Sequence, residues 1–238
     1  MDNNPNPSNP TLKTAWGISI LIKTPYNTIL FDAGPNPYIL KYNVEALGED
    51  DDLRTLDLVV ISHEHGDHVR GLRYIAKVKQ GVKVYVPEGM YYSTKDWIRS
   101  LGLKVIEVYE TTKICRGVAI IGEMYGPPYE QALAINVKGL GLIIVTGCSH
   151  PGVENIARKA LNELKIKPYA VIGGFHLAGA PTSELEVIIN ELINLGVKKI
   201  YPLHCSGDEI RELLKSKYNE FYGEGYVGST IEFKGEDK

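Results

Sequence analysis

The chain has 238 residues, of which 44% are hydrophobic and 23% are charged, a balance typical of a soluble globular protein with a buried core. Its 26 basic and 29 acidic side chains give a formal net charge of −3, which provides no electrostatic footprint for nucleic acid. The apolar runs are of strand length and too short to span a membrane. We therefore expect neither nucleic acid nor a membrane as a partner.

The first ten residues, MDNNPNPSNP, are mostly asparagine and proline, and we predict that they form a disordered arm. They have neither the basic region nor the apolar region of a signal peptide. The three cysteines, Cys115, Cys148 and Cys205, are an odd number at scattered positions, which does not indicate a disulfide framework. These features predict a cytoplasmic protein with reduced thiols.

Short β-type runs and amphipathic segments alternate after this arm. The first half opens with two runs, 17–24 and 27–34, separated by a hairpin-like break. The continuous apolar run 56–63 is typical of a buried strand. Apolar residues at helical spacing follow over 67–79, and Asp67 is able to cap this helix. Further strands of this half are predicted at 82–88, 100–110 and 117–124.

The second half repeats this alternation of strands and helices. Its predicted strands are 132–139, 140–148, 168–176 and 197–205, and its predicted helices are 152–165, 182–196 and 206–218. The proline-rich turn 125–130 is the predicted boundary between the halves. The pattern indicates two sheets with helices outside, in one domain over 11–238 with halves of about 11–126 and 127–238.

All six histidines lie at or just past the end of a predicted strand, where rigid scaffolds usually present functional groups. In HEHGDH, over 63–68, alternate residues of an extended chain point the same way, so His63 and His65 can hold one ion. Asp67 and His68 lie just beyond and can serve a second ion, at the ~3.5–4 Å spacing of two-metal hydrolytic sites. A single histidine is usually structural, but this clustering indicates a metal site. Imidazole and carboxylate together suit zinc, iron, manganese or nickel.

The motif HxHxDH after a buried strand, formed by His63, His65, Asp67 and His68, resembles the metallo-β-lactamase superfamily. An upstream strand that ends in Asp-x-Gly, at Asp32, is similar to the same superfamily. The stretches TGCSHPGVENI, GGFHL and PLHCSG resemble an archaeal and bacterial subgroup, some of whose members are named dihydropterin synthases of methanopterin assembly. The resemblance implies an α/β fold (α+β by sheet type), a four-layer αβ/βα sandwich, with the site at one edge between the sheets.

The resemblance also implies the metal ligands. The first ion would be held by His63, His65 and His150, and the second by Asp67, His68 and His204. Cys148 stands where many relatives have a bridging aspartate, so it is either a thiolate bridge, which would favour zinc, or a small buried residue. The number of ions, one or two, stays open for this reason. Asp32 is expected either to anchor a hydrogen bond behind a ligand or to be a turn residue.

Four residues are candidates for the substrate pocket. His176 is predicted to be a substrate contact or proton shuttle, with a structural role as the alternative. Gly173 and Gly174 would let the backbone come close to a ligand. Trp16 stands where members of the subgroup commonly have a histidine, and it would make the pocket more apolar and better suited to a flat ring.

The sequence thus predicts a metal-dependent hydrolase that acts on a small ester, phosphoester or related substrate. A metal-activated water, oriented by Asp67, would attack the substrate, and His176 would protonate the leaving group. The first alternative is a metal-dependent transferase that joins an arylamine ribofuranosyl phosphate to a dihydropterin diphosphate; the second is a non-catalytic metal- or ligand-binding module. Zinc is the expected metal, with iron, manganese or nickel as alternatives, and no organic cofactor is expected. The substrate and the oligomeric state stay open.

Overall fold

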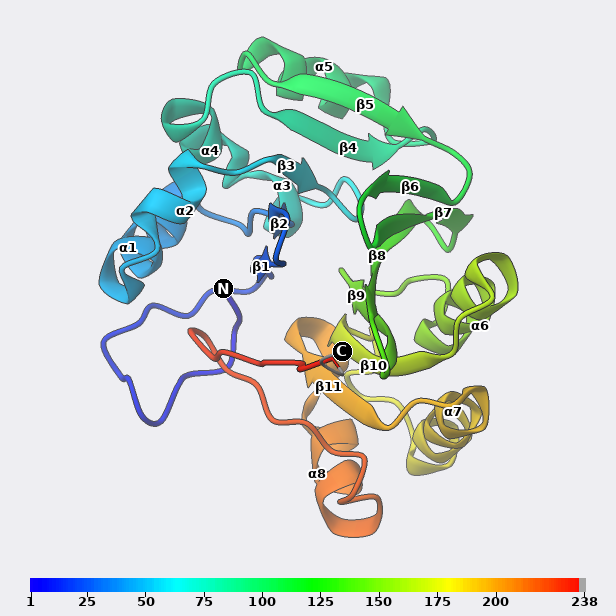
Figure 1. Ribbon diagram of the computed structural model, residues 1–238. Helices are drawn as coiled ribbons and strands as arrows, with labels where there is room; N and C mark the ends of the chain where they lie inside the picture. Colours follow the sequence, from blue (N-terminus) through cyan, green and yellow to red (C-terminus); the bar gives the residue numbers. More distant parts are fainter. Residues whose placement is uncertain (236–238) are drawn as a thin grey trace.

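The computed structural model describes residues 1–235 and arranges them as two facing β-sheets with helices on both outer sides (Figure 1). The first sheet has the order β1 (Ile20–Lys23), β2 (Thr28–Phe31), β3 (Leu58–Val60), β4 (Lys83–Pro87) and β5 (Lys104–Val108). The second has the order β11 (Lys199–Leu203), β10 (Pro168–Gly174), β9 (Gly141–Thr146), β8 (Tyr129–Val137), β7 (Val118–Tyr125) and β6 (Thr112–Cys115). The predicted α/β fold with a layered sandwich of two sheets is confirmed.

Helices cover the outer face of each sheet. Those of the first half are α1 (Pro37–Leu47), α2 (Asp50–Arg54), α3 (Gly66–Val69), α4 (Leu72–Val78) and α5 (Tyr92–Ser100). Those of the second half are α6 (Val153–Leu164), α7 (Thr182–Leu195) and α8 (Asp208–Lys217), with a 3-10 turn η1 (His204–Ser206). The helix predicted over 67–79 is split into α3 and α4. The split lies at Gly71, which packs closely against the residues that follow β2. A Cβ at Gly71 would lie 1.8 Å from the Ala33 carbonyl oxygen.

Parallel pairing brings the carboxyl ends of several strands to one edge of the sandwich. In the first sheet, Val60 of β3 pairs with Phe31 of β2, so the segments after both strands leave side by side. In the second sheet, Gly173 of β10 pairs with Thr146 of β9, and Gly174 pairs with Leu203 of β11. The histidine-bearing loops therefore start from a common edge.

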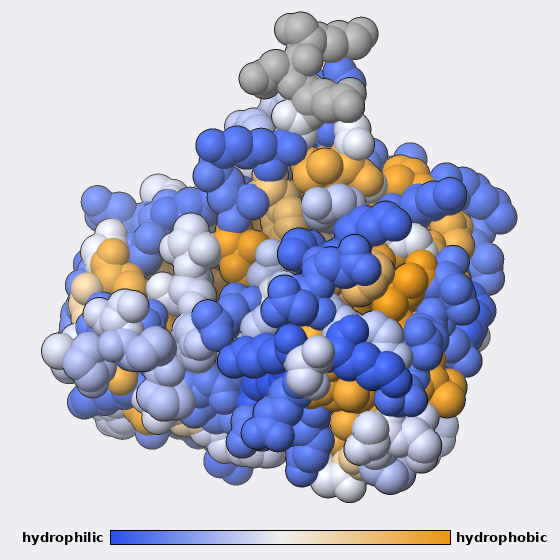
Figure 2. Space-filling view, turned by 90° about the horizontal axis from the view of Figure 1, so that it is seen from below, coloured by the Kyte–Doolittle hydropathy of each residue, from blue (hydrophilic) through white to orange (hydrophobic). Residues whose placement is uncertain are grey.

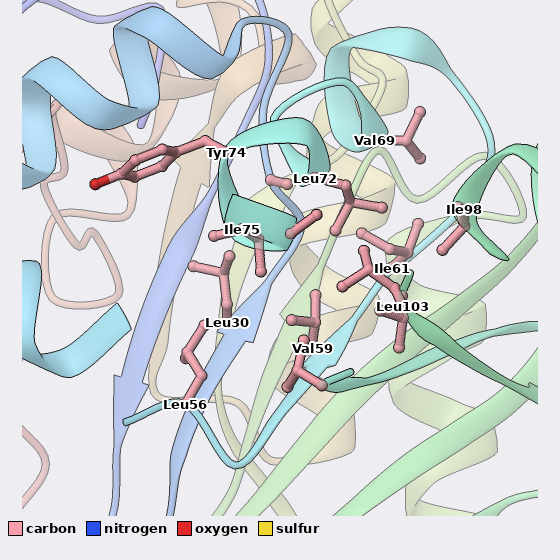
Figure 3. Close-up of a cluster of buried hydrophobic side chains, with 14 of the residues drawn as sticks. Leu30, Leu56, Val59, Ile61, Val69, Leu72, Tyr74, Ile75, Ile98 and Leu103 are labelled. Carbon is pink, nitrogen blue, oxygen red and sulfur yellow. The ribbon is translucent and has the colours of Figure 1, made fainter. Parts of the chain in front are cut away.

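Apolar side chains fill the spaces between the layers. The cluster between the two sheets includes Ile29, Phe31 and Val60 of the first sheet and Ile120 and Leu133 of the second. Figure 3 shows the cluster between the first sheet and its helices, with Leu30, Leu56, Val59, Ile61, Val69, Leu72, Tyr74, Ile75, Ile98 and Leu103 labelled. Burial on both faces explains why β3 reads as a continuous apolar run.

The boundary between the halves differs from the predicted one. The turn over 125–130 joins β7 to β8, which pair antiparallel within the second sheet. The chain passes from the first sheet to the second earlier, between β5 and β6. The physical reason is antiparallel pairing of β6 with β7 and of β7 with β8. This pairing puts residues 112–125 in the second sheet, whereas the predicted boundary put them in the first half. Residues 236–238 of the predicted domain lie outside the described residues.

Residues 1–10, here called the N-terminal segment, follow a defined path instead of forming the expected disordered arm. Asp2 is only 2% exposed. The Val227 backbone nitrogen donates to the Asn4 carbonyl at 3.0 Å, and Asn6 Nδ2 donates to the Val227 carbonyl at 2.9 Å. The segment and the chain near Val227 thus lie against each other (Figure 1). Its polar groups are held by hydrogen bonds, which a composition with few apolar residues does not reveal.

Polar and apolar residues intermingle on the face of the molecule shown in Figure 2. Within residues 1–235, no helix combines the length and the apolar character needed to cross a membrane.

Candidate metal centre

Three loops at the shared sheet edge bring the predicted ligands together. The segment after β3 carries His63, His65, Asp67 and His68, the segment after β9 carries Cys148 and His150, and His204 follows β11. Side-chain ligand atoms gather within 4.8 Å of one another in four groups: His63, His65 and His150; Asp67, His68 and His204; His63, His68 and Cys148; and Cys148, His176 and Cys205. The first two groups are those that the resemblance implied for the two ions.

The first group has the spacing of ligands around one ion. His63 Nε2 lies 3.1 Å from His65 Nδ1, and the His150 ring lies 4.7 Å from the His63 ring. Two nitrogens bound to one tetrahedral zinc lie about 3.3 Å apart, so the observed distance suits a shared ion. Burial, with the neighbouring histidines His68 and His150, lowers the pKa of His63 well below its usual value. A neutral His63 has a nitrogen lone pair to offer a cation.

The second group combines a carboxylate with two imidazoles. Asp67 Oδ2 lies 3.6 Å from His68 Nε2 and 3.3 Å from His204 Nε2. Burial raises the pKa of Asp67, but the close approach of the His204 side chain and the charge of His68 outweigh it and bring the pKa to about 2. Asp67 is therefore ionised at neutral pH.

His204 Nε2 offers a direct test of whether a metal fits the second group. This nitrogen is buried and makes no hydrogen bond within residues 1–235, since its contact with Asp67 does not have hydrogen-bond geometry. Buried polar atoms without a partner are rare, and each calls for an explanation. A cation held beside Asp67 would satisfy the nitrogen, and the donor set of two imidazoles and a carboxylate suits zinc and its first-row neighbours.

Cys148 lies between the two groups. Its Sγ is 3.2 Å from His68 Nε2, and it shares a cluster of ligand atoms with His63 and His68. Hydrogen bonding to Cys205, together with burial, raises the pKa of the Cys148 thiol. A thiolate at this position therefore depends on a neighbouring cation, because only a cation would offset the desolvation of the charge.

Three histidines of the centre are held through Nδ1, which turns Nε2 toward the other ligands. His63 Nδ1 lies 2.9 Å from Ser62 Oγ, His68 Nδ1 lies 2.7 Å from Asp32 Oδ2, and His150 Nδ1 lies 2.8 Å from a carboxylate described below. Asp32 is fully buried and also accepts from the Ser62 nitrogen and hydroxyl, each at 2.7 Å. Such hydrogen bonds set the tautomer and the orientation of a ligating imidazole.

Glu130, at the start of β8, is a site residue that sequence reasoning missed. Its Oε1 accepts from the backbone nitrogens of Cys148 and Ser149, and its Oε2 accepts from the nitrogen and Nδ1 of His150, each at 2.8 Å. Burial raises the pKa of Glu130, but the hydrogen bonds and charge of His150 and the backbone donors outweigh it, so the pKa lies below its usual value. The one available signal was an acidic residue at the start of an otherwise apolar strand.

The candidate pocket residues differ in how far they are exposed near the centre. Trp16 is 59% exposed and its ring lies 5.0 Å from the His204 ring, at the edge of the centre. His176 is exposed, and its ring lies 4.7 Å from the His150 ring. Gly173 and Gly174 are buried against β9 and the residues that follow it. A Cβ on them would lie 2.1 Å from the Thr146 carbonyl and 2.3 Å from the Gly147 carbonyl, so these glycines allow close strand packing.

A cavity of about 350 Å³ adjoins the loop that carries HEHGDH. Glu64 and Gly66 of this loop line it, together with Arg70, Arg73 and Trp97. The guanidinium of Arg70 lies against Gly66, where an added Cβ would be 2.7 Å from its Nε. The cavity and the candidate ligands thus share this loop.

Comparisons with known proteins show what the chain is similar to. Residues 27–119 match the model of the beta-lactamase superfamily domain. The chain is 29% identical, over 91% of its length and 90% of the relative, to a 7,8-dihydropterin-6-methyl-4-(β-D-ribofuranosyl)-aminobenzene-5'-phosphate synthase of Methanocaldococcus jannaschii.

Solved structures share the fold over nearly the whole chain. The metal-dependent hydrolase Tm1679 of the β-lactamase superfamily superposes with a TM-score of 0.80 at 24% identity, covering 98% of this chain and 96% of that one. An isothiocyanate hydrolase from Delia radicum gut bacteria superposes with a TM-score of 0.63 at 14% identity, covering 92% and 97%. Residues 27–119 are thus similar to the beta-lactamase superfamily domain, and the fold of the chain is similar to that of a metal-dependent hydrolase of this superfamily.

Proposed function

We propose that this protein is a hydrolase that uses one or two metal ions, zinc by preference, to cleave a small ester or phosphoester. The observation that carries the proposal is the convergence of two ligand groups on one sheet edge, with His204 Nε2 buried and without a hydrogen bond in the described chain. Bound ions would lower the pKa of water from ~15.7 toward ~7 and stabilise developing negative charge.

The side chains around the centre have separate tasks in this proposal. Asp67, ionised at neutral pH, holds the second group together and orients the attacking water. His63 is kept neutral by its burial and its histidine neighbours, so its lone pair is available. His176 stands beside His150 but is exposed, which leaves it free to protonate a leaving group. Partial desolvation of its ring, together with the neighbouring His150, lowers the pKa of His176, which favours release of its proton.

The arginine-lined cavity suits an anionic group on the substrate. Arg70 and Arg73 place two guanidinium groups next to the loop of the metal centre, and guanidinium groups bind phosphate and carboxylate through paired hydrogen bonds. We therefore favour a phosphorylated or carboxylated small molecule over a neutral ester.

A second candidate function is a metal-dependent transferase, which is supported by the similarity to the M. jannaschii synthase. In that reaction class an arylamine ribofuranosyl phosphate, rather than water, would displace the diphosphate of a dihydropterin. The same arginine side chains would suit the phosphate of the amine.

One experiment separates the two candidates. Zinc-loaded protein is incubated with matched neutral and phosphorylated esters, and separately with a dihydropterin diphosphate with and without the arylamine. Hydrolysis with water alone, faster on the phosphorylated ester, is the expected result. Product that forms only when the arylamine is present would support the transferase instead. Bound metal without turnover of any of these compounds would contradict both and leave a binding module.

Replacement of Cys148 by serine tests whether sulfur takes part in the centre. In cobalt-loaded wild-type protein we expect a thiolate-to-metal absorption band, because Cys148 Sγ lies 3.2 Å from His68 Nε2, among the ligand atoms. The band should disappear in Cys148→Ser and persist in Cys205→Ser, the matched control in the neighbouring cysteine. An equally strong band in Cys148→Ser would remove Cys148 from the ligand set.

A further inference from the structure

We propose that Asp2 and Asn3 are positioning residues of the metal centre that hold His204 as a ligand. This inference rests on the proposed function, because it assumes that His204 binds an ion. It assigns a role to the N-terminal segment, which the family motifs do not include.

The N-terminal segment contacts His204 through its backbone and its ring. Asp2 Oδ1 accepts from the His204 backbone nitrogen at 3.2 Å, and Asn3 Nδ2 donates to the His204 carbonyl at 3.3 Å. Asn3 Oδ1 lies 3.4 Å from His204 Nδ1, in hydrogen-bond geometry. Both backbone groups and one ring nitrogen of His204 are therefore bound by two consecutive residues.

His204 needs such support more than the other histidines of the loops after β3 and β9. Its φ of 48° lies in the left-handed region, which a residue with a Cβ adopts only when its surroundings hold it there. The 3-10 turn that contains it begins without a side-chain cap. The hydrogen bonds from Asp2 and Asn3 hold the backbone in this conformation.

The contact at Nδ1 of His204 matches those of three other histidines of the centre, each of which has a polar partner at Nδ1. Nδ1 of His63, His68 and His150 faces Ser62, Asp32 and Glu130, all of which belong to the sandwich itself. For His204 the Nδ1 partner is Asn3. An amide oxygen at Nδ1 selects the tautomer with the proton on Nδ1, which leaves the Nε2 lone pair directed at Asp67 and at the second ion.

The segment is anchored independently of His204 and can therefore impose this geometry. The Ala15 nitrogen donates to the Asp2 carbonyl at 3.3 Å, and the Val227 nitrogen donates to the Asn4 carbonyl at 3.0 Å. Asn6 Nδ2 donates to the Val227 carbonyl without contacting His204. Asn6 is thus a matched control for Asn3. It is the same residue type in the same segment, and it hydrogen-bonds to Val227 and not to His204.

The test measures zinc affinity alone, by competition with a chromophoric chelator, in full-length wild type, Asn3→Ala, Asn3→Asp and Asn6→Ala. Loss of a hydrogen bond behind a ligating histidine typically weakens metal binding 10- to 100-fold. We therefore expect Asn3→Ala to lose its more weakly bound zinc at a chelator concentration about 10-fold lower than wild type does. Asn3→Asp keeps an acceptor at Nδ1 but loses the donor to the His204 carbonyl, so its zinc affinity should lie between those of Asn3→Ala and wild type. Asn6→Ala should match wild type.

Two results would overturn the inference. One is unchanged zinc affinity in Asn3→Ala; the other is an equal loss in Asn3→Ala and Asn6→Ala, which would mean that the segment acts only as a tether. If Asn3→Ala does not fold, Asn3→Ser is compared with Asn6→Ser in the same way. His204→Ala separates this inference from the proposed function. Weaker zinc binding in His204→Ala together with wild-type zinc affinity in Asn3→Ala contradicts the inference alone, and wild-type zinc affinity in His204→Ala contradicts the ligand set.

Discussion

Replacement of Glu130 by glutamine is expected to lower the free energy of unfolding of the metal-free protein by about 3 kcal/mol, since breaking a buried charged network typically costs 3–5 kcal/mol. The Glu130 carboxylate is fully buried and accepts four hydrogen bonds from the loop after β9. An amide keeps one acceptor oxygen but turns donor hydrogens toward the nitrogens of His150. Urea unfolding followed by circular dichroism, in the presence of a chelator, measures the difference.

The pH dependence of this difference has a definite sign. The pKa of Glu130 is lowered in the folded protein from the ordinary value of 4.5, so its stabilising effect is fully present above pH 4.5. The effect is lost as the pH falls through the lower folded-state pKa, and the gap between wild type and Glu130→Gln should narrow there. Glu110→Gln, at an exposed position, is the control and should change stability by less than about 0.5 kcal/mol. Equal stability of Glu130→Gln and wild type at neutral pH would show that the carboxylate does not organise the loop.

Replacement of His150 and of His176 by alanine should have different effects, although the two rings lie 4.7 Å apart. His150 belongs to the first ligand group and is oriented by Glu130, so His150→Ala is expected to lose bound zinc and, with it, activity. His176 is exposed and is proposed to deliver a proton, so His176→Ala should retain zinc and lose about 100-fold in kcat, the lower range for general acid catalysis.

Elemental analysis of the dialysed proteins and steady-state kinetics on the hydrolysed ester make this comparison. A substrate whose leaving group needs no proton should restore the rate of His176→Ala but not that of His150→Ala. Loss of zinc in His176→Ala would move His176 into the ligand set. Wild-type zinc content in His150→Ala would remove His150 from it.

The ligand groups could be predicted from the sequence because their signals are local. HEHGDH combines metal-binding side chains with the two-residue period of an extended chain, and the apolar run before it marks a buried strand. The positions of His150 and His204 after apolar runs placed them at strand ends, and parallel pairing then brought those ends to one edge. Asp32 stood out for the same reason, as an acidic residue at the end of β2.

Other features depended on contacts between distant segments. The helix α1 was missed although Asn36 caps it by accepting from the Tyr38 and Ile39 nitrogens, a signal that is visible in the sequence but weak alone. The close packing at Gly173 could not be predicted, because only the structure shows how near β10 lies to Thr146. The boundary between the halves was misplaced because a proline-rich turn looks the same within a sheet and between sheets.

The sequence by itself determined the kind of chemistry at the centre, because side-chain type and strand period decide which atoms can face one ion. The tertiary structure alone decided what holds those atoms in place. Glu130 acts mainly through backbone nitrogens, which carry no sequence pattern, and Asn3 reaches His204 across 201 positions of the chain. The composition of the N-terminal segment suggested disorder and could not show these contacts. The segment has little apolar surface of its own to bury, and hydrogen bonds to the rest of the folded chain stabilise it instead.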